Sequence, residues 1–248
     1  MKKGVSIIAT SLVASTFLMV GCGSSCDQDT SVKYYNGKFV DSAVAGVSYS
    51  CGSKSGVTDS EGVFGPCVVG DPVSFSLGTI LLGTVNDTTV FEDPTKTIIT
   101  PTILAEASGD DEVAQKVAVT LQSFDEDGDP TNGITITEKT VEVVSQTYTT
   151  PVDLTDPEVT VADVETDVSE VVDKVVEETG NTAMDAKTAD EAQAHLEETE
   201  KEIEEGTITP PEQPDDENGG IITPPDDENG SITPPDDEDG STGAVASN

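Results

Sequence analysis

Polar and apolar residues alternate with a period of about two between residues 32 and 99. Short apolar runs, such as VSYSC (47–51) and PVSFSLGTILLG (72–83), are separated by Gly, Pro, Asp and Ser. This pattern is typical of half-buried strands joined by tight turns. The sequence therefore predicts a small antiparallel β-sandwich over residues 32–99, with a hairpin turn at Ser60–Gly62.

Helical spacing replaces the alternation near residue 100. Thr100 and Pro101 suit the N-cap and the first position of a helix. Thr188 and Glu191 have the spacing of a capping box. Residues 100–206 are therefore predicted to form a helical segment, which makes the fold α+β. Apolar residues recur every three or four positions in three further stretches, which are 110–124, 161–179 and 188–205.

From residue 207 the chain repeats a short acidic unit rich in proline. The near copies are ITPPEQPDDENGG, ITPPDDENGS and ITPPDDEDGS. Diproline favours an extended polyproline helix, and the acidic side chains repel one another. Such a segment has too few apolar residues for a core, so residues 207–248 are predicted to be a disordered tail.

The first residues have the pattern of an export signal. Lys2 and Lys3 precede an apolar run that is short for a membrane-spanning helix, although an uncleaved anchor is the alternative. LMVGC, which ends at Cys22, resembles the lipobox of bacterial lipoproteins. The resemblance implies that residues 1–21 are a signal peptide, that Cys22 is acylated, and that residues 22–31 form a tether.

Acylation would fix the protein to a membrane, because each buried methylene contributes about 0.8 kcal/mol. Gly23 and Ser24 follow Cys22, where some lipoproteins have Asp. By analogy with Gram-negative lipoproteins, this implies sorting to the outer membrane. The protein would face either the periplasm or the cell surface.

Cysteine usage agrees with export. Cys51 and Cys67 bracket a segment rich in turn residues, and a disulfide between them suits an oxidising compartment. Closing a loop of about 15 residues stabilises a fold by roughly 3 kcal/mol. A metal or redox pair is the alternative, but the C-x-x-C spacing and a nearby His are missing. Cys26 is left unpaired or joined to another chain.

Composition limits the partners. The chain has 248 residues and a formal net charge of -38, with 11 basic residues, all of them Lys. A chain of this charge is repelled by phosphate backbones, so nucleic acid is excluded as a partner. The expected partners are the membrane, through the lipid, and an envelope or surface protein or glycan.

Several stretches between Lys38 and Ile136 resemble a module of exported proteobacterial lipoproteins. They are DSAVAGVSYSCGSKSGVTDSEGVF, DPVSFSLGTILLG, ITPTIL and VAVTLQSFDEDGDPTNGITI. Phe124 stands where the module usually has Leu. The β part is also similar to the transthyretin-like and CnaB-like sandwiches of cell-surface proteins. The resemblance implies this fold and an exported location, but no settled activity.

The acidic stretch DEDGDPTN, residues 125–132, is the best candidate for chemistry. Calcium takes six to eight hard oxygen ligands from a flexible loop. Possible ligands in this stretch are Asp125, Asp127, Asp129 and Asn132. The stretch departs from an EF-hand at Pro130 and Ile136, so the choice is between a shorter calcium site and a polar turn after a helix. Carboxylates at a helix C-terminus oppose the macrodipole unless a cation is present.

An enzymatic reading is weak, because adjacent carboxylates in one turn rarely face each other across a cleft. The single histidine, His195, lies in a stretch of Glu and Ala. The first hypothesis is therefore a non-enzymatic, lipid-anchored module for interaction, adhesion or envelope structure. The alternatives are a calcium-dependent binding module and an envelope hydrolase without a recognised motif.

Overall fold

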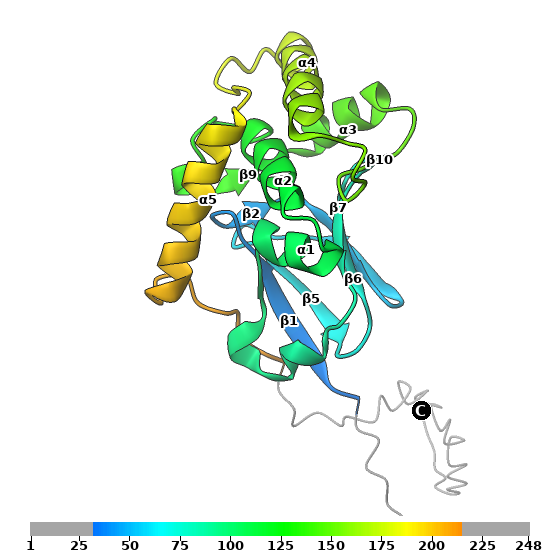
Figure 1. Ribbon diagram of the computed structural model, residues 1–248, viewed down its shortest axis with the longest axis vertical. Coiled ribbons are helices and arrows are strands. Elements are labelled where there is room, and N and C mark those ends of the chain that lie inside the picture. Colours follow the sequence, from blue (N-terminus) through cyan, green and yellow to red (C-terminus); the bar gives the residue numbers. More distant parts are fainter. Residues whose placement is uncertain (1–31, 215–248) are drawn as a thin grey trace, which may run out of the picture. The chain divides into compact units, whose positions relative to one another are not determined.

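The computed structural model describes residues 32–214 of the chain and has an α+β fold, as the sequence predicts (Figure 1). The predicted signal peptide, the tether with Cys22 and Cys26, and the tail beyond Pro214 lie outside the described residues. Within residues 32–214, no helix is long and apolar enough to span a membrane.

The strands form two larger sheets and one small one. The first sheet has the order β5-β1-β8, with β1 Tyr34–Phe39, β5 Val63–Val68 and β8 Ile98–Ile99. The second has the order β10-β7-β6-β3-β4, with β3 Ser48–Cys51, β4 Lys54–Val57, β6 Val73–Leu77, β7 Ile80–Val85 and β10 Val152–Asp153. The small sheet pairs β2 Val44–Ala45 with β9 Ile134–Thr135. The longer strands pair antiparallel, whereas β8, β9 and β10 each join their neighbours in parallel.

Aromatic side chains and a disulfide join the two larger sheets. Phe39 of β1 stacks on Phe75 of β6, with ring centroids 4.6 Å apart, and Phe64 of β5 meets the edge of Phe75 at 5.0 Å. Cys51 of β3 is bonded to Cys67 of β5, which confirms the predicted disulfide. The core of the β part is therefore closed both by packing and by a covalent link.

The turn at Ser60–Gly62 is present, but the predicted hairpin is wrong. Strands β4 and β5, which flank the turn, belong to different sheets, so the turn carries the chain from one sheet to the other. Asp59 Oδ1 accepts hydrogen bonds from the backbone N–H groups of Glu61 and Val63, each at 2.9 Å. Gly62 has φ +77°, and a Cβ there would lie 2.4 Å from the carbonyl oxygen of Phe39. The turn can therefore approach β1 only because this residue is glycine.

The α-helices follow the predicted pattern, with one addition. The Thr100 side chain caps the first helix, and Thr188 and Glu191 form the expected capping box. The addition is α3, which the sequence did not predict. The helices are α1 Pro101–Ser108, α2 Glu112–Ser123, α3 Glu138–Thr147, α4 Val161–Thr179 and α5 Ala189–Glu204, and the short 3-10 helices are η1 Thr89–Glu92, η2 Pro94–Lys96 and η3 Pro130–Asn132.

Helix α2 lies at the centre of the helical layer. It contacts α1, α4 and α5, and Figure 1 shows it between these neighbours. The predicted apolar stripe of Val113, Val117, Leu121 and Phe124 is fully buried. Strands β9 and β10 extend from the helical segment to pair with β2 and β7. The helices and sheets therefore share one continuous hydrophobic core.

The start of the repeat segment lies against the β part. The Asn36 N–H donates to Gln213 Oε1 at 3.1 Å, and Gln213 Nε2 donates to the Asn36 carbonyl at 3.1 Å. Asn36 Nδ2 also donates to the carbonyl of Glu212 at 2.9 Å. Glu212 and Gln213, which belong to the predicted tail, are therefore hydrogen-bonded to β1. Later copies of the repeat have Asp after the diproline and do not contain this Gln.

The disulfide should contribute measurably to stability. The bond closes a loop with a sequence separation of 16, so breaking it should lower the free energy of unfolding by about 3 kcal/mol in the chain-entropy model. Urea unfolding of residues 27–248, with and without reductant, measures this difference. A Cys51→Ala/Cys67→Ala variant should unfold at low urea and be insensitive to reductant. Equal midpoints for oxidised and reduced wild-type protein would contradict the prediction.

Candidate functional site

The acidic stretch directly follows α2 and bends back onto β9. The Glu126 N–H donates to the Thr135 carbonyl at 2.9 Å, and the Thr135 N–H donates to Asp125 Oδ1 at 2.8 Å. Asp125 is therefore held between the end of α2 and a strand, and only 1% of its surface is exposed. The other carboxylates of the stretch remain exposed.

Asp125 and Asp127 form a carboxyl pair. Asp125 Oδ2 is buried and has no hydrogen-bond donor. Burial, together with the neighbouring Asp127 carboxylate, raises the pKa of Asp125 to about 6. Hydrogen bonds from Asn132 Nδ2 and from the Asp129 N–H, each at 3.0 Å, lower the pKa of Asp127. Asp127 is thus ionised at neutral pH, whereas Asp125 takes up a proton as the pH falls through its pKa of about 6.

The four predicted ligands do not form a calcium cage in this arrangement. Asp129 Oδ1 accepts from the N–H and hydroxyl groups of Thr131, and the Asn132 amide donates to Asp127. Within residues 32–214, no group of three or more His, Cys, Asp or Glu side chains is placed to hold a metal ion. A cation at this loop would have at most the neighbouring carboxylates of Asp125 and Asp127, and backbone oxygens or solvent would have to supply its remaining ligands.

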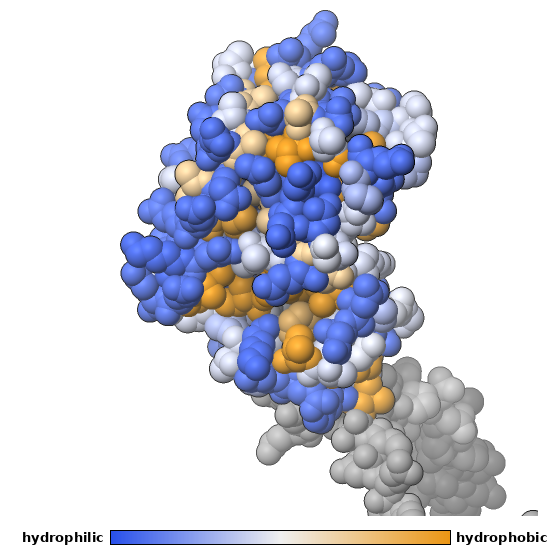
Figure 2. All heavy atoms as spheres, in the orientation of Figure 1, coloured by the Kyte–Doolittle hydropathy of each residue, from blue (hydrophilic) through white to orange (hydrophobic). Residues whose placement is uncertain are grey.

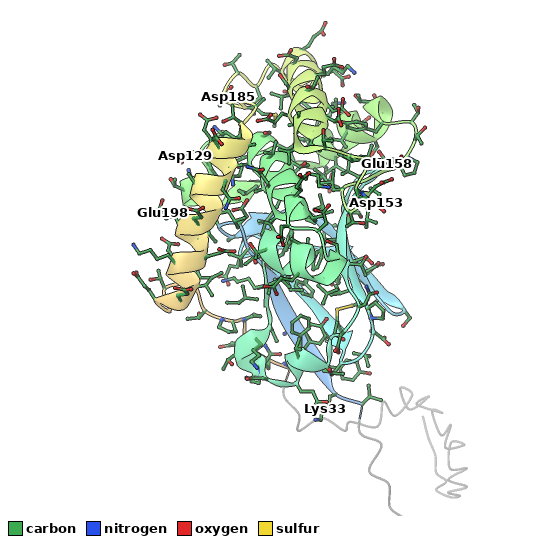
Figure 3. The ribbon with its side chains drawn as sticks, viewed as in Figure 1. Lys33, Asp129, Asp153, Glu158, Asp185 and Glu198 are labelled. Carbon is green, nitrogen blue, oxygen red and sulfur yellow. A yellow bond between two sulfur atoms is a disulfide. The ribbon has the colours of Figure 1, made fainter. Side chains whose placement is uncertain are left out.

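The acidic loop also supports the connection between α4 and α5. Lys187 Nζ donates to the carbonyl of Gly128 at 2.9 Å, and Asn181 Nδ2 donates to the carbonyl of Glu126 at 2.6 Å. A Cβ on Gly128 would lie 2.3 Å from the Ala183 carbonyl oxygen. Lys187 supplies a positive charge near the C-terminal end of α2, where the helix dipole favours one. Figure 3 shows Asp129 beside the N-terminal half of α5.

A second polar cluster lies in the turn after β1, where Asp41 is completely buried. Asp41 Oδ2 accepts from Gln122 Nε2 of α2 at 2.9 Å, and the same nitrogen donates to the Ala192 carbonyl of α5 at 3.1 Å. Asp41 Oδ1 has no partner. Burial raises the pKa of Asp41 to about 7, the Gln122 hydrogen bond opposes this shift, and the Glu200 charge adds to it.

Ser42 extends this cluster to α5. Its N–H donates to Thr199 Oγ1 at 3.1 Å, and its hydroxyl lies 3.2 Å from Nε2 of His195. Ser42 has φ +58°, a left-handed conformation that non-glycine residues rarely adopt. Burial lowers the pKa of His195, so its imidazole is neutral at pH 7.

This Ser–His pair differs from a hydrolytic triad in one respect. The carboxylate of Asp41 is bonded to Gln122 and not to the imidazole. In a triad, a carboxylate fixes the tautomer and the orientation of the histidine. The contacts of Ser42 instead join the β1–β2 turn to α5. We call this polar cluster the α5 latch; it consists of Asp41, Ser42, Gln122, His195 and Thr199.

A groove is the third feature, and sequence reasoning did not find it. It has a volume of about 760 Å³ and lies between α1, α5 and the η1–η2 segment. Figure 2 shows hydrophobic surface between α5 and α1 on this face. Its apolar lining includes Val85, Val90, Ile98, Ile103 and Ile203. The acidic residues around it are Asp87, Glu106, Glu200 and Glu204, and the basic one is Lys96. We name this feature the α1–α5 groove.

The buried Asp41 should make stability depend on pH. Its folded-state pKa is about 7, against 3.8 for the free side chain, so folding takes up a proton between these values. The free energy of unfolding should therefore fall as pH rises from 5 to 7, by up to about 1.4 kcal/mol per pH unit. The fall should be smaller in Asp41→Asn. Urea unfolding at each pH measures it.

A control isolates this effect from general charge repulsion. Asp173→Asn removes one exposed carboxylate from α4 and should leave the pH dependence close to that of the wild type. His195 has a lowered pKa, so its contribution runs in the opposite direction, but it is common to all three proteins. Identical pH profiles for the wild type and Asp41→Asn would contradict the assignment.

In comparisons with known proteins, no family model, no curated protein and no solved structure matched this chain.

Proposed function

We propose that this protein is a lipid-anchored module of the cell envelope that acts by binding a partner and not by catalysis. The lipobox-like LMVGC, which ends at Cys22, is the basis for the anchor. The Cys51–Cys67 disulfide supports an oxidising compartment. The acyl chains would hold the module at the outer membrane.

The observation that supports a binding role is that the buried ionisable groups hold parts of the fold together. Asp41 holds Gln122, and Asp125 accepts from Thr135. Lys116 is fully buried in α2, pairs with Asp110 at 3.3 Å, and donates to the carbonyls of Asp156 and Val159. Each of these groups connects separate segments of the fold. The α1–α5 groove, with a volume of about 760 Å³, is the surface that we assign to a partner.

The anchor is tested by replacing its cysteine. In a Gram-negative host, wild-type protein should incorporate labelled palmitate and sediment with membranes. Cys22→Ala should lose the palmitate label, because no other residue occupies the lipobox position. Cys26→Ala is the matched control and should behave like the wild type. Labelling of Cys22→Ala at the wild-type level would contradict lipidation at this residue.

A calcium-dependent role is the second candidate, and the unpartnered Asp125 Oδ2 is the observation that favours it. A divalent cation between Asp125 and Asp127 would replace the proton that burial otherwise favours on Asp125. Calcium would then compete with protons for Asp125. We therefore expect calcium to bind more weakly below the Asp125 pKa of about 6.

Thermal or urea unfolding of residues 27–248 tests this candidate. At pH 7.5, calcium at 100 times its Kd should add about 2.7 kcal/mol relative to EDTA. The gain should shrink at pH 5 and disappear in Asp127→Asn. Without calcium, Asp127→Asn should differ little from the wild type.

Asp153→Asn is the matched control for the calcium test. Asp153 also begins an acidic turn, in which its Oδ1 accepts from the Thr155 N–H at 2.9 Å, and its carboxylate is exposed like that of Asp127. Figure 3 places it across the molecule from Asp129. A calcium effect that survives Asp127→Asn, or no effect at any pH, would reject the site at Asp125 and Asp127.

A further inference from the structure

The α1–α5 groove combines an apolar floor with an acidic rim. Its volume of about 760 Å³ is within the range of roughly 300–1,000 Å³ for clefts that bind small-molecule ligands. Val90 lies on η1 and is 49% exposed, although it is a large apolar residue. An apolar surface of this kind, surrounded by charges, is typical of a binding site.

The rim has a net negative charge. Glu106 extends from α1, and Glu204 from the end of α5, and both are exposed. The one basic residue on the rim, Lys96, lies 3.9 Å from Asp93 and is thereby partly compensated. Any segment whose apolar side chains enter the groove therefore lies next to carboxylates whose charge no basic residue of the rim neutralises. Charge complementarity requires basic residues in that occupant.

Two other occupants are disfavoured by charge. The described chain ends at Pro214, next to Gln213, whose Nε2 lies 3.4 Å from Thr97 Oγ1 near the groove. The repeats that follow offer Ile and Pro, but each carries several acidic residues that the rim would repel. A second copy of the chain is repelled even more strongly, because each copy has a net charge of -38.

We propose that the α1–α5 groove binds a polypeptide segment in which a few apolar side chains are flanked by Lys or Arg. The apolar side chains enter between Ile103, Ile203 and Val90, and the basic ones meet the carboxylates of Glu106 and Glu204. This inference rests on the proposed binding role and gives that role a surface and a partner chemistry. The partner is a basic, amphipathic segment of another envelope or surface protein.

The test uses residues 27–248, which keep every described residue, and a short fluorescent Leu–Lys peptide as the probe. Fluorescence anisotropy measures the Kd. The buffer contains about 0.15 M salt, because this concentration screens interactions between surface charges that are more than about 8 Å apart. Val90→Lys removes an apolar side chain from the floor and adds a repulsive charge. It should raise the Kd by at least about tenfold.

Val57→Lys is the matched control. Val57 lies on the edge strand β4, is 59% exposed, and does not line the groove, while the substitution changes net charge by the same amount. Its Kd should stay within about twofold of the wild type. Equal weakening by Val57→Lys and Val90→Lys would mean that only overall charge attracts the peptide, and would overturn the proposal. So would a failure of the peptide to bind.

A second pair of variants keeps the test valid if Val90→Lys fails to fold. Glu106→Gln/Glu204→Gln removes two rim charges, and Glu170→Gln/Glu177→Gln removes two exposed charges from α4. The rim pair should weaken peptide binding about fivefold more than the α4 pair. Equal effects of the two pairs would overturn the proposal.

Two further outcomes would assign the groove to another occupant. Competition of the Leu–Lys peptide by an ITPPDDENG peptide would identify the chain's own tail, and self-association that is lost in Val90→Lys would identify a second copy. Either result would overturn the proposed partner. Cys22-dependent labelling is independent of all these measurements, so the lipid anchor could stand while the groove assignment fails.

Discussion

The position of α5 depends on buried polar contacts with one tight turn. The apolar stripe of α5 is narrow, with Ala192, Leu196 and Thr199 as its buried residues. The α5 latch adds what this stripe lacks: Gln122 connects Asp41 to the Ala192 carbonyl, and Ser42 contacts His195 and Thr199. Because α5 forms one wall of the α1–α5 groove, the shape of the proposed binding surface depends on these contacts.

The acidic loop and the α5 latch have one structural feature in common. Each buries one carboxylate at a junction between elements and leaves one of its oxygens without a partner. A buried, unpaired carboxylate is costly when ionised, so protonation relieves it. Lys187 and Asn181 bind the acidic loop through its carbonyl groups, not through its carboxylates. The loop thus has a structural role in joining α2 to the connection between α4 and α5.

Local patterns predicted much of this fold, and long-range contacts account for what they missed. The valine stripe of α4 was visible because its spacing is helical throughout. Residues 140–144 of α3, TVEVV, are mostly β-branched, and polar residues alternate with valine at the start of the run. This pattern resembles that of a strand. The Ser60–Gly62 turn was recognisable, but a turn does not determine which strands pair. Asp41 resembles an ordinary turn residue, but it is buried against Gln122 of α2, 81 residues further along the chain. The next residue, Ser42, contacts His195 of α5 at a separation of 153 residues.

The central claim is that the buried polar contacts of the latch, and not apolar packing alone, hold α5 in place. Hydrogen–deuterium exchange of Gln122→Met tests it most directly, because Met keeps the volume but removes the donor to Asp41 and Ala192. The account predicts faster exchange in residues 189–204, with α4 and the strands of the two larger sheets unchanged. Unchanged protection of α5, or an equal loss throughout the protein, would contradict it.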